Sequence, residues 1–228
     1  MSLLLIRKNL SSIFSILLIL IIITLFFETI HGTHFNVRNQ CLFTVYAASL
    51  PGGGKQLLPG QTSTWSFDVN MGTFPARIWG RTGCSFDEAG RGKCLTCDCG
   101  GLLKCQDSGQ PPCTMAEYHP TLNIDYLDIS LVDGLPMEFS PTGGGCAKGI
   151  RCVADISRDC PFELRVPGAC KNACLFNNAY DFGRCSGPTS YSRFFKARCP
   201  DAYSYPHDDE TAFFSCPGGT NYRVVFCP

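Results

Sequence analysis

Residues 90–105 read GRGKCLTCDCGGLLKC, with four cysteines and four glycines in a short span. They lie within a longer stretch, 82–112, in which apolar and polar residues barely alternate. This composition is typical of a loop-rich lobe fastened by local disulfide bonds. A structural zinc site usually has paired Cys or Cys/His groups well apart in sequence. The 16 cysteines of this chain are instead scattered from Cys41 to Cys227, so we expect disulfides and no metal or cofactor.

The first 32 residues have the pattern of a secretory signal peptide. Arg7 and Lys8 precede an apolar stretch at 13–27, and Gly32 offers a small residue for cleavage. A membrane anchor is the alternative, because the apolar stretch approaches the length that crosses a bilayer. All 16 cysteines follow this leader. An even, dense set of cysteines behind a signal peptide predicts a secreted, extracellular protein with a disulfide framework.

The charge balance argues against two classes of partner. Cleavage would remove Arg7, Lys8 and Glu28, so the 19 basic and 19 acidic residues fall to 17 and 18, a net charge of −1. A near-neutral protein lacks the field that draws proteins to nucleic acid or to anionic membranes. We therefore expect a monomer with no nucleic-acid partner, whose electrostatic interactions come from local patches.

Outside the cysteine-rich stretches, apolar residues recur with a period of two. Trp65, Phe67 and Val69 share one face of a predicted strand, and similar short runs occur at 35–37, 126–132 and 222–226. Gly- and Pro-containing turns separate these runs. Short alternating strands between such turns predict a mainly β protein, an antiparallel sandwich or barrel.

A second cysteine-rich stretch, 154–199, also breaks the alternation. It contains the best helix candidate of the mature chain, at 190–198. Thr189 or Ser190 is a suitable N-cap residue, and Pro200 provides the stop. The sequence therefore predicts one sheet core with two disulfide-rich lobes, the second of which carries a short helix.

Several segments closely resemble the thaumatin-like family, which includes thaumatin and the osmotin-type pathogenesis-related proteins of plants. The segment 90–105 follows the family pattern Gly-x-Gly-x-Cys-x-Thr-Gly/Ala-Asp-Cys, then a glycine and another cysteine, except that Cys97 occupies the small-residue position. The likeness continues through NQCLFTVYAAS (39–49), ARIWGRTGCSF (76–86), ELRVPGAC (163–170) and CPGGTNYRVVFCP (216–228). It covers essentially the whole chain after the leader.

The resemblance implies a flattened antiparallel β-sandwich flanked by two smaller disulfide-rich lobes, one of which contains a short helix. The sandwich would take residues 33–81, 113–153 and 200–228. The lobes would take 82–112 and 154–199, the same two stretches that lack alternation.

The resemblance also implies most of the disulfide pairing. The family usually has an adjacent Cys-Cys and a third cysteine after the position of Cys174, where this chain has only Cys185, so we expect one bridge, Cys174–Cys185, in place of two. Cys97 and Cys113 fall outside the family pattern at the borders of the first lobe, and we predict that they bond to each other. The remaining pairs implied by the family are Cys41–Cys227, Cys84–Cys94, Cys99–Cys105, Cys146–Cys216, Cys152–Cys199 and Cys160–Cys170.

By resemblance, function resides in an acidic cleft formed by one arginine, one glutamate and three aspartates. Asp128 and Asp133 would face opposite ways on a straight strand. They converge only if Asp133 already lies in the Asp-Gly turn that ends the strand. Matching by local motif assigns the cleft to Arg77, Glu117, Asp128, Asp133 and Asp208, with Asp209 as the alternative to Asp208.

Such a cleft implies a plant defence protein of the apoplast. The leading hypothesis is antifungal: the cleft binds fungal cell-wall β-1,3-glucan, or it perturbs the fungal membrane through a receptor. The alternative is a weak endo-β-1,3-glucanase with Glu117 as the acid and Asp128 or Asp133 as its partner. That reaction needs a carboxyl group with a raised pKa and a carboxyl separation of about 5–5.5 Å or about 6.5–9.5 Å.

Two other interpretations of these residues compete with a functional cleft. The five residues could be ordinary charged groups near strand ends, since charged side chains mostly lie at the surface. A sweet-tasting protein is disfavoured, because Leu95 and Gln110 stand at the positions that resemble receptor-facing basic residues of thaumatin.

Overall fold

The computed structural model describes residues 32–67, 75–121, 123–132, 134–143, 145–146, 148–172, 174 and 187–228. Residues 1–31 of the predicted signal peptide, Asp133 and Cys185 therefore lie outside the described residues. No helix in the described ranges is long and apolar enough to cross a membrane.

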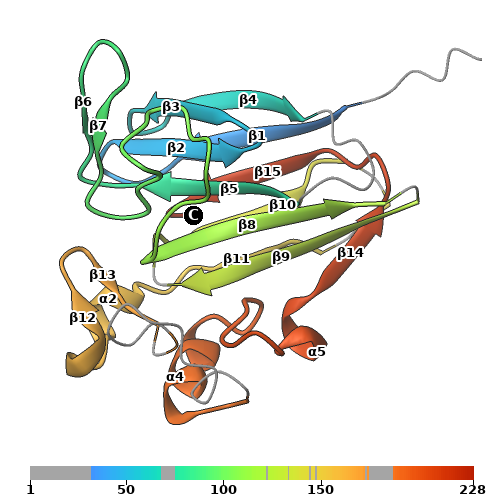
Figure 1. Cartoon of the computed structure of the whole chain (residues 1–228). Coiled ribbons are helices and arrows are strands. Elements are labelled where there is room, and N and C mark those ends of the chain that lie inside the picture. The colour runs from blue at the N-terminus through green and yellow to red at the C-terminus, as the bar shows by residue number, and fades with distance from the viewer. Residues whose placement is uncertain are drawn as a thin grey trace, which may run out of the picture. The chain divides into compact units, whose positions relative to one another are not determined.

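Two β-sheets form the centre of the unit 32–228 (Figure 1). The five-stranded sheet contains, from edge to edge, β11 (Ile150–Cys152), β10 (Met137–Pro141), β15 (Tyr222–Phe226), β1 (Thr33–Asn39) and β4 (Thr62–Phe67). The six-stranded sheet contains β14 (Phe214–Pro217), β9 (Ile124–Val132), β8 (Cys113–Pro120), β5 (Ala76–Arg81), β2 (Val45–Leu50) and β3 (Gly53–Leu57). The predicted mainly β fold is confirmed.

The two sheets pack face to face around an aromatic centre. Alternate residues of β1 are buried, which places Phe35 and Val37 in the core. The Phe35 ring lies 5.1 Å from the Tyr118 ring of β8 and 5.5 Å from the Tyr222 ring of β15. Both tyrosine hydroxyls donate hydrogen bonds to the buried carboxylate of Asp125, at 3.1 and 2.8 Å. The core therefore joins one sheet to the other, as a sandwich requires.

One strand pair departs from the expected antiparallel pattern: β1 and β15 are parallel, with Asn39 opposite Phe226. The other pairings within the two large sheets are antiparallel. Parallel strands end at the same edge of a sheet. Cys41 and Cys227, which closely follow β1 and β15, therefore meet there and form a disulfide bond that links the two ends of the unit 32–228.

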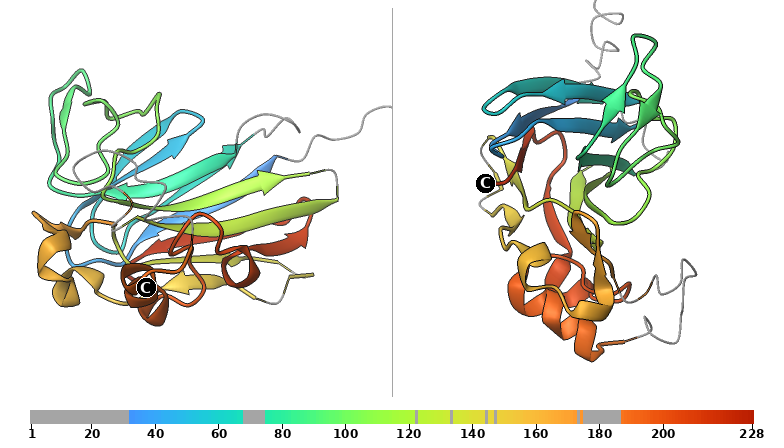
Figure 2. Two further views of the ribbon diagram at one scale, coloured as in Figure 1. Left: turned by 60° about the horizontal axis from the view of Figure 1, so that its bottom comes forward. Right: turned by 90° about the vertical axis from the view of Figure 1, so that its left-hand side faces the viewer.

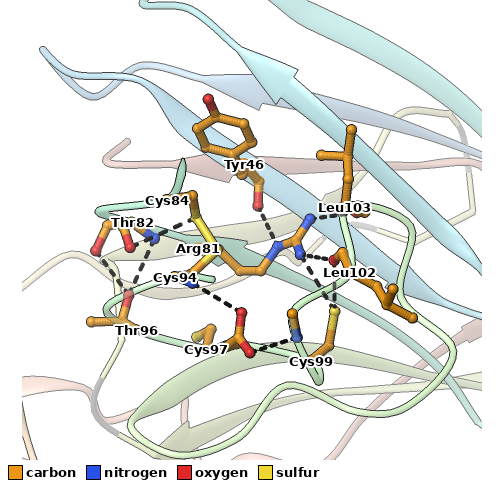
Figure 3. The surroundings of a disulfide bond; sticks show 12 residues. Tyr46, Arg81, Thr82, Cys84, Cys94, Thr96, Cys97, Cys99, Leu102 and Leu103 are labelled. Carbon is orange, nitrogen blue, oxygen red and sulfur yellow. Dashed lines mark hydrogen bonds between the residues drawn. A yellow bond between two sulfur atoms is a disulfide. The ribbon is translucent and has the colours of Figure 1, made fainter. Parts of the chain in front are cut away.

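The lobe at 82–112 is organised around a buried arginine. It contains the short strands β6 (Ser85–Phe86) and β7 (Gly92–Lys93). Arg81 is 0% exposed, and its guanidinium donates to the carbonyl oxygens of Tyr46, Leu102 and Leu103 at 3.2, 2.6 and 2.6 Å (Figure 3). Burial lowers the pKa of Arg81 to about 10, against the opposing attraction of Asp98. The buried cation thus takes the place of regular backbone pairing in this lobe.

The lobe at 154–199 lies beside one edge of the six-stranded sheet, and β6 and β7 lie beside the opposite edge (Figures 1 and 2). The predicted helix at 190–198 is confirmed: α4 begins after Thr189, whose hydroxyl accepts from the Ser192 amide, and it ends at the residue before Cys199. In the part of this lobe that the structure describes, the other elements are α2 (Ile156–Asp159), η1 (Phe162–Leu164), β12 (Arg165–Val166) and β13 (Ala169–Cys170). A last helix, α5 (Asp209–Ala212), precedes β14.

Disulfide bonds cross-link both lobes and the sandwich. Cys97 bonds to Cys113, the pair expected at the borders of the first lobe. Cys174 is also disulfide-bonded, while its expected partner Cys185 lies outside the described residues. The other pairs in the described ranges coincide with those that the family resemblance implies: Cys41–Cys227, Cys84–Cys94, Cys99–Cys105, Cys146–Cys216, Cys152–Cys199 and Cys160–Cys170.

Candidate functional site

Three of the predicted cleft residues lie side by side on adjacent strands. Arg77 of β5 is directly opposite Glu117 of β8, and Glu117 is directly opposite Asp128 of β9. Tyr118, the neighbour of Glu117, points into the sandwich core, so Glu117 faces the other side of the sheet. Strand register thus brings together side chains that are far apart in the sequence.

Arg77 and Glu117 form an ion pair at one end of this row. Arg77 Nε lies 2.5 Å from Glu117 Oε1, and Arg77 Nη1 donates to the hydroxyl of Ser108 at 3.4 Å. The guanidinium is therefore committed to one carboxylate oxygen and one hydroxyl. Arg77 contacts Glu117 but does not line the pocket described below.

Asp128, at the other end of the row, is a buried carboxyl group. It is 5% exposed, because the segment after α4 covers β9: the Tyr203 amide donates to the carbonyl of Ile129 at 2.9 Å. Burial, together with the negative charge of Glu117 and a hydrogen bond to it, raises the pKa of Asp128 to about 8. Asp128 therefore carries a proton at neutral pH. No described residue donates a hydrogen bond to its Oδ1 atom.

His119 lies on the same face of β8 as Glu117, beside Asp128 of β9. Its Nε2 atom lies 3.9 Å from Asp128 Oδ2, beyond hydrogen-bond distance. Burial lowers the pKa of His119, and the positive charge of Arg77 acts in the same direction, while Glu117 opposes both. The imidazole is therefore neutral at physiological pH.

A pocket of about 580 Å³ opens above this part of the sheet. Glu117, Asp128 and His119 form its base, and Asp209 adds a third acid. Pro111 reaches it from the first lobe, and Asn172 and Cys174 reach it from the second. The remaining lining residues are Ser130, Tyr203, Ser204, Tyr205, Pro206 and Phe213. The pocket thus lies between the two lobes, where the family resemblance places a cleft.

The aromatic side chains at this pocket were not identified from the sequence as site residues. Phe213 is 43% exposed, and its ring stacks on the ring of Tyr126 at 5.0 Å, so the ring is held in place with one part facing solvent. Tyr203 and Tyr205 also line the pocket. The aromatic residues Trp79 and Tyr118, by contrast, are buried in the core and do not line the pocket.

The structure separates the two neighbouring aspartates of the PHDDE segment. Asp208 lies outside this pocket: its carboxylate accepts from Lys196 Nζ at 3.0 Å, from the Ser204 hydroxyl at 2.8 Å and from the Thr211 hydroxyl at 2.8 Å. Burial opposes ionisation of Asp208, but these hydrogen bonds outweigh it and lower the pKa. Asp209, the alternative assignment, lines the pocket and accepts a hydrogen bond from the Tyr203 hydroxyl.

Among the described residues, no group of three or more His, Cys, Asp and Glu side chains is arranged to hold a metal ion. Glu117 accepts a hydrogen bond from Arg77 and Asp209 accepts one from the Tyr203 hydroxyl, and both carboxylates also line the pocket. Acids at the base and aromatic rings on the walls suit a polar ligand that also has an apolar face.

Comparisons with known proteins agree with this architecture. Residues 39–228 match the sequence model of the thaumatin family. The chain is 56% identical to a thaumatin-like protein of Actinidia deliciosa, over 92% of this chain and 95% of that protein. It is 53% identical to zeamatin of Zea mays, over 85% of this chain and 90% of zeamatin. Among solved structures it is similar to the thaumatin-like xylanase inhibitor TLXI, with a TM-score of 0.50 and 26% identity over 85% of this chain and 99% of that one.

Proposed function

This chain belongs to the thaumatin family, and from that premise we propose that it is a secreted plant defence protein that binds fungal cell-wall β-1,3-glucan. The binding site is the pocket above β8 and β9. Relatives described as pathogenesis-related, such as one from Cryptomeria japonica at 51% identity, are consistent with a role in defence.

One observation carries the proposal: acids and solvent-facing aromatic rings line the same pocket. Glu117 and Asp209 can accept hydrogen bonds from sugar hydroxyl groups. The exposed part of the Phe213 ring offers an apolar surface for the face of a pyranose. Anionic lipid is poorly matched to a pocket whose charged lining is acidic, so a glycan is the better partner.

Hydrolysis of the glycan receives less support than binding. The carboxyl that holds the raised pKa is Asp128, whereas the sequence assigned the role of acid to Glu117. Glu117 and Asp128 are also directly opposite each other on adjacent strands, and Glu117 is among the causes that raise the pKa of Asp128, so the two carboxyl groups interact directly. This arrangement favours one proton shared by Glu117 and Asp128. It does not favour an acid and a nucleophile on opposite sides of a glycosidic bond.

Calorimetric titration with a soluble β-1,3-glucan hexamer tests the proposal. Phe213→Ala should weaken binding about tenfold, because loss of a stacking surface costs about 1.4 kcal/mol. Phe162→Ala is the matched control, because Phe162 is 85% exposed and lies outside the pocket. Equal affinity of the Phe213→Ala variant and the wild type would refute the assignment of the pocket. Release of reducing sugar by the wild type, lost in Glu117→Gln, would favour the glucanase.

A further inference from the structure

The base of the pocket holds a buried carboxyl oxygen with no donor. Asp128 Oδ1 receives no hydrogen bond from any described residue, although Asp128 is 95% buried and lines the pocket. We infer that the preferred ligand of this pocket is an amino sugar whose free ammonium group contacts Asp128, Glu117 and Asp209, as in a deacetylated glucosamine polymer. This inference rests on the proposed function as a glycan-binding pocket and names the sugar class that fits it best.

The pocket lining carries an excess of acidic groups around Asp128. On β5, Arg77 is committed to Glu117 and Ser108 and does not line the pocket. On β8, His119 is neutral at physiological pH, since burial lowers its pKa. The carboxyl groups that line the pocket in the described ranges are Glu117, Asp128 and Asp209, and no lysine or arginine of these ranges lines it with them.

Lys196 is also engaged elsewhere. On α4, Lys196 Nζ lies 3.0 Å from Asp208 Oδ2 and donates to the carbonyl of Ala202 at 3.0 Å. It lines a neighbouring depression rather than this pocket. The segment that covers β9 contributes the Tyr203 hydroxyl, which donates to Asp209, while Asp128 Oδ1 receives no hydrogen bond from the described residues.

An ammonium group fits this set of acceptors better than a hydroxyl or a metal ion. It has three N–H donors and a full positive charge, so one group can contact several carboxylate oxygens at once. A sugar hydroxyl has one donor and cannot compensate a buried negative charge. The described acids do not form a cluster suited to a metal ion.

The aromatic walls favour an ammonium that is attached to a sugar ring over the side chain of a lysine. Phe213, fixed by stacking on Tyr126, presents a flat surface beside the acids, and Tyr205 lines the same pocket. A pyranose can lie against such a ring while its amine reaches the carboxylates, and the ring also attracts the cation. A flexible alkyl chain would gain less from the flat surface.

Binding of an ammonium should release the proton that Asp128 holds. The proton now compensates the carboxyl group, and a bound cation would replace it. If binding requires ionised Asp128, the affinity rises close to tenfold per pH unit below the pKa of this group. A neutral sugar would bind without this pH dependence.

The experiment is calorimetric titration of the full mature chain at pH 5 and pH 6 with three tetramers: β-1,4-glucosamine, its N-acetylated form, and β-1,3-glucose. We expect the glucosamine tetramer to bind at least tenfold more tightly than the N-acetylated one. We also expect its affinity to rise up to tenfold from pH 5 to pH 6, with proton release, while the neutral tetramers show no such rise.

Variants and a peptide complete the test. Asp128→Asn should lose the pH dependence and weaken glucosamine binding at least tenfold, and Asp209→Asn should weaken it with the pH dependence retained. Glu88→Gln, which removes an exposed acid outside the pocket, should match the wild type. A lysine-rich tetrapeptide that bound as tightly as the glucosamine tetramer would overturn the sugar assignment.

The outcomes separate this inference from the proposed function. Equal binding of all three tetramers, or of the wild type and Asp128→Asn, overturns the amino-sugar inference and leaves glycan binding standing. Absence of binding to any tetramer overturns both.

Discussion

Replacement of Asp128 by asparagine should stabilise the folded protein at neutral pH and alter the pH dependence of its stability. In the folded state Asp128 is protonated up to about pH 8, whereas in the unfolded chain it ionises near its ordinary value of 3.8. The folded state therefore binds more protons between these values, and its free energy of unfolding falls as the pH rises. Asparagine has the shape of the neutral acid and does not titrate, so the variant does not lose this free energy of unfolding as the pH rises.

The size of the effect follows from the two pKa values. Each pH unit within the window costs the wild type up to about 1.4 kcal/mol. From pH 5 to pH 7 the variant should therefore gain up to about 3 kcal/mol relative to the wild type, a large share of a typical domain's stability. The free energies of unfolding of the two proteins should be most similar at pH 4, where the wild-type carboxyl is close to neutral in both the folded and the unfolded state.

Guanidinium unfolding with the disulfides intact, followed by tryptophan fluorescence, measures this difference. Asp208→Asn provides a control of opposite sign, because hydrogen bonds lower the pKa of Asp208 despite its burial. The stability that Asp208 contributes is present at neutral pH and is lost as the pH falls through its folded-state pKa. Asp208→Asn should thus be less stable than the wild type at pH 7, by about 2 kcal/mol. A constant gap between Asp128→Asn and the wild type from pH 5 to pH 7 would refute the buried, protonated state of Asp128.

Two further predictions concern the first lobe. Arg81→Met should destabilise this lobe by about 3 kcal/mol, because three backbone carbonyls lose their hydrogen-bond donor. Amide hydrogen exchange should become faster in 82–112 and change little in β1 and β15. An equal change in exchange rate throughout the protein would count against this prediction. The double variant Cys97→Ala/Cys113→Ala should lose about 3 kcal/mol, the loop-entropy value for a sequence separation of 16, which calorimetric melting would measure. An unchanged melting temperature would show that this bond contributes nothing beyond its neighbours.

Local elements were predictable because their signals are local. The α4 boundaries follow from Thr189, the capping residue, and from Pro200, which stops the helix. The strands β4, β9 and β15 follow from apolar residues at every second position, since alternate side chains of a strand face opposite sides. Family resemblance added the disulfide pairs, which no local pattern could have assigned.

The candidate site was predictable only in part. The family resemblance singled out Arg77, Glu117 and Asp128, and strand register places them in one row. The choice between Asp208 and Asp209 could not be made from two adjacent acids in the sequence. It depends on Lys196, a residue of α4 that holds Asp208 away from the pocket.

The sequence by itself determined the longer alternating strands, the helix α4, and that the cysteines would form a disulfide framework. Only the tertiary structure decided the chemistry of the pocket. Asp128 is an ordinary acid in the unfolded chain, and it becomes a protonated one because the segment around Tyr203 covers it beside Glu117. The physical reason is that hydration and neighbouring charge set the ionisation of a carboxyl group, and both are properties of packing between residues distant in sequence.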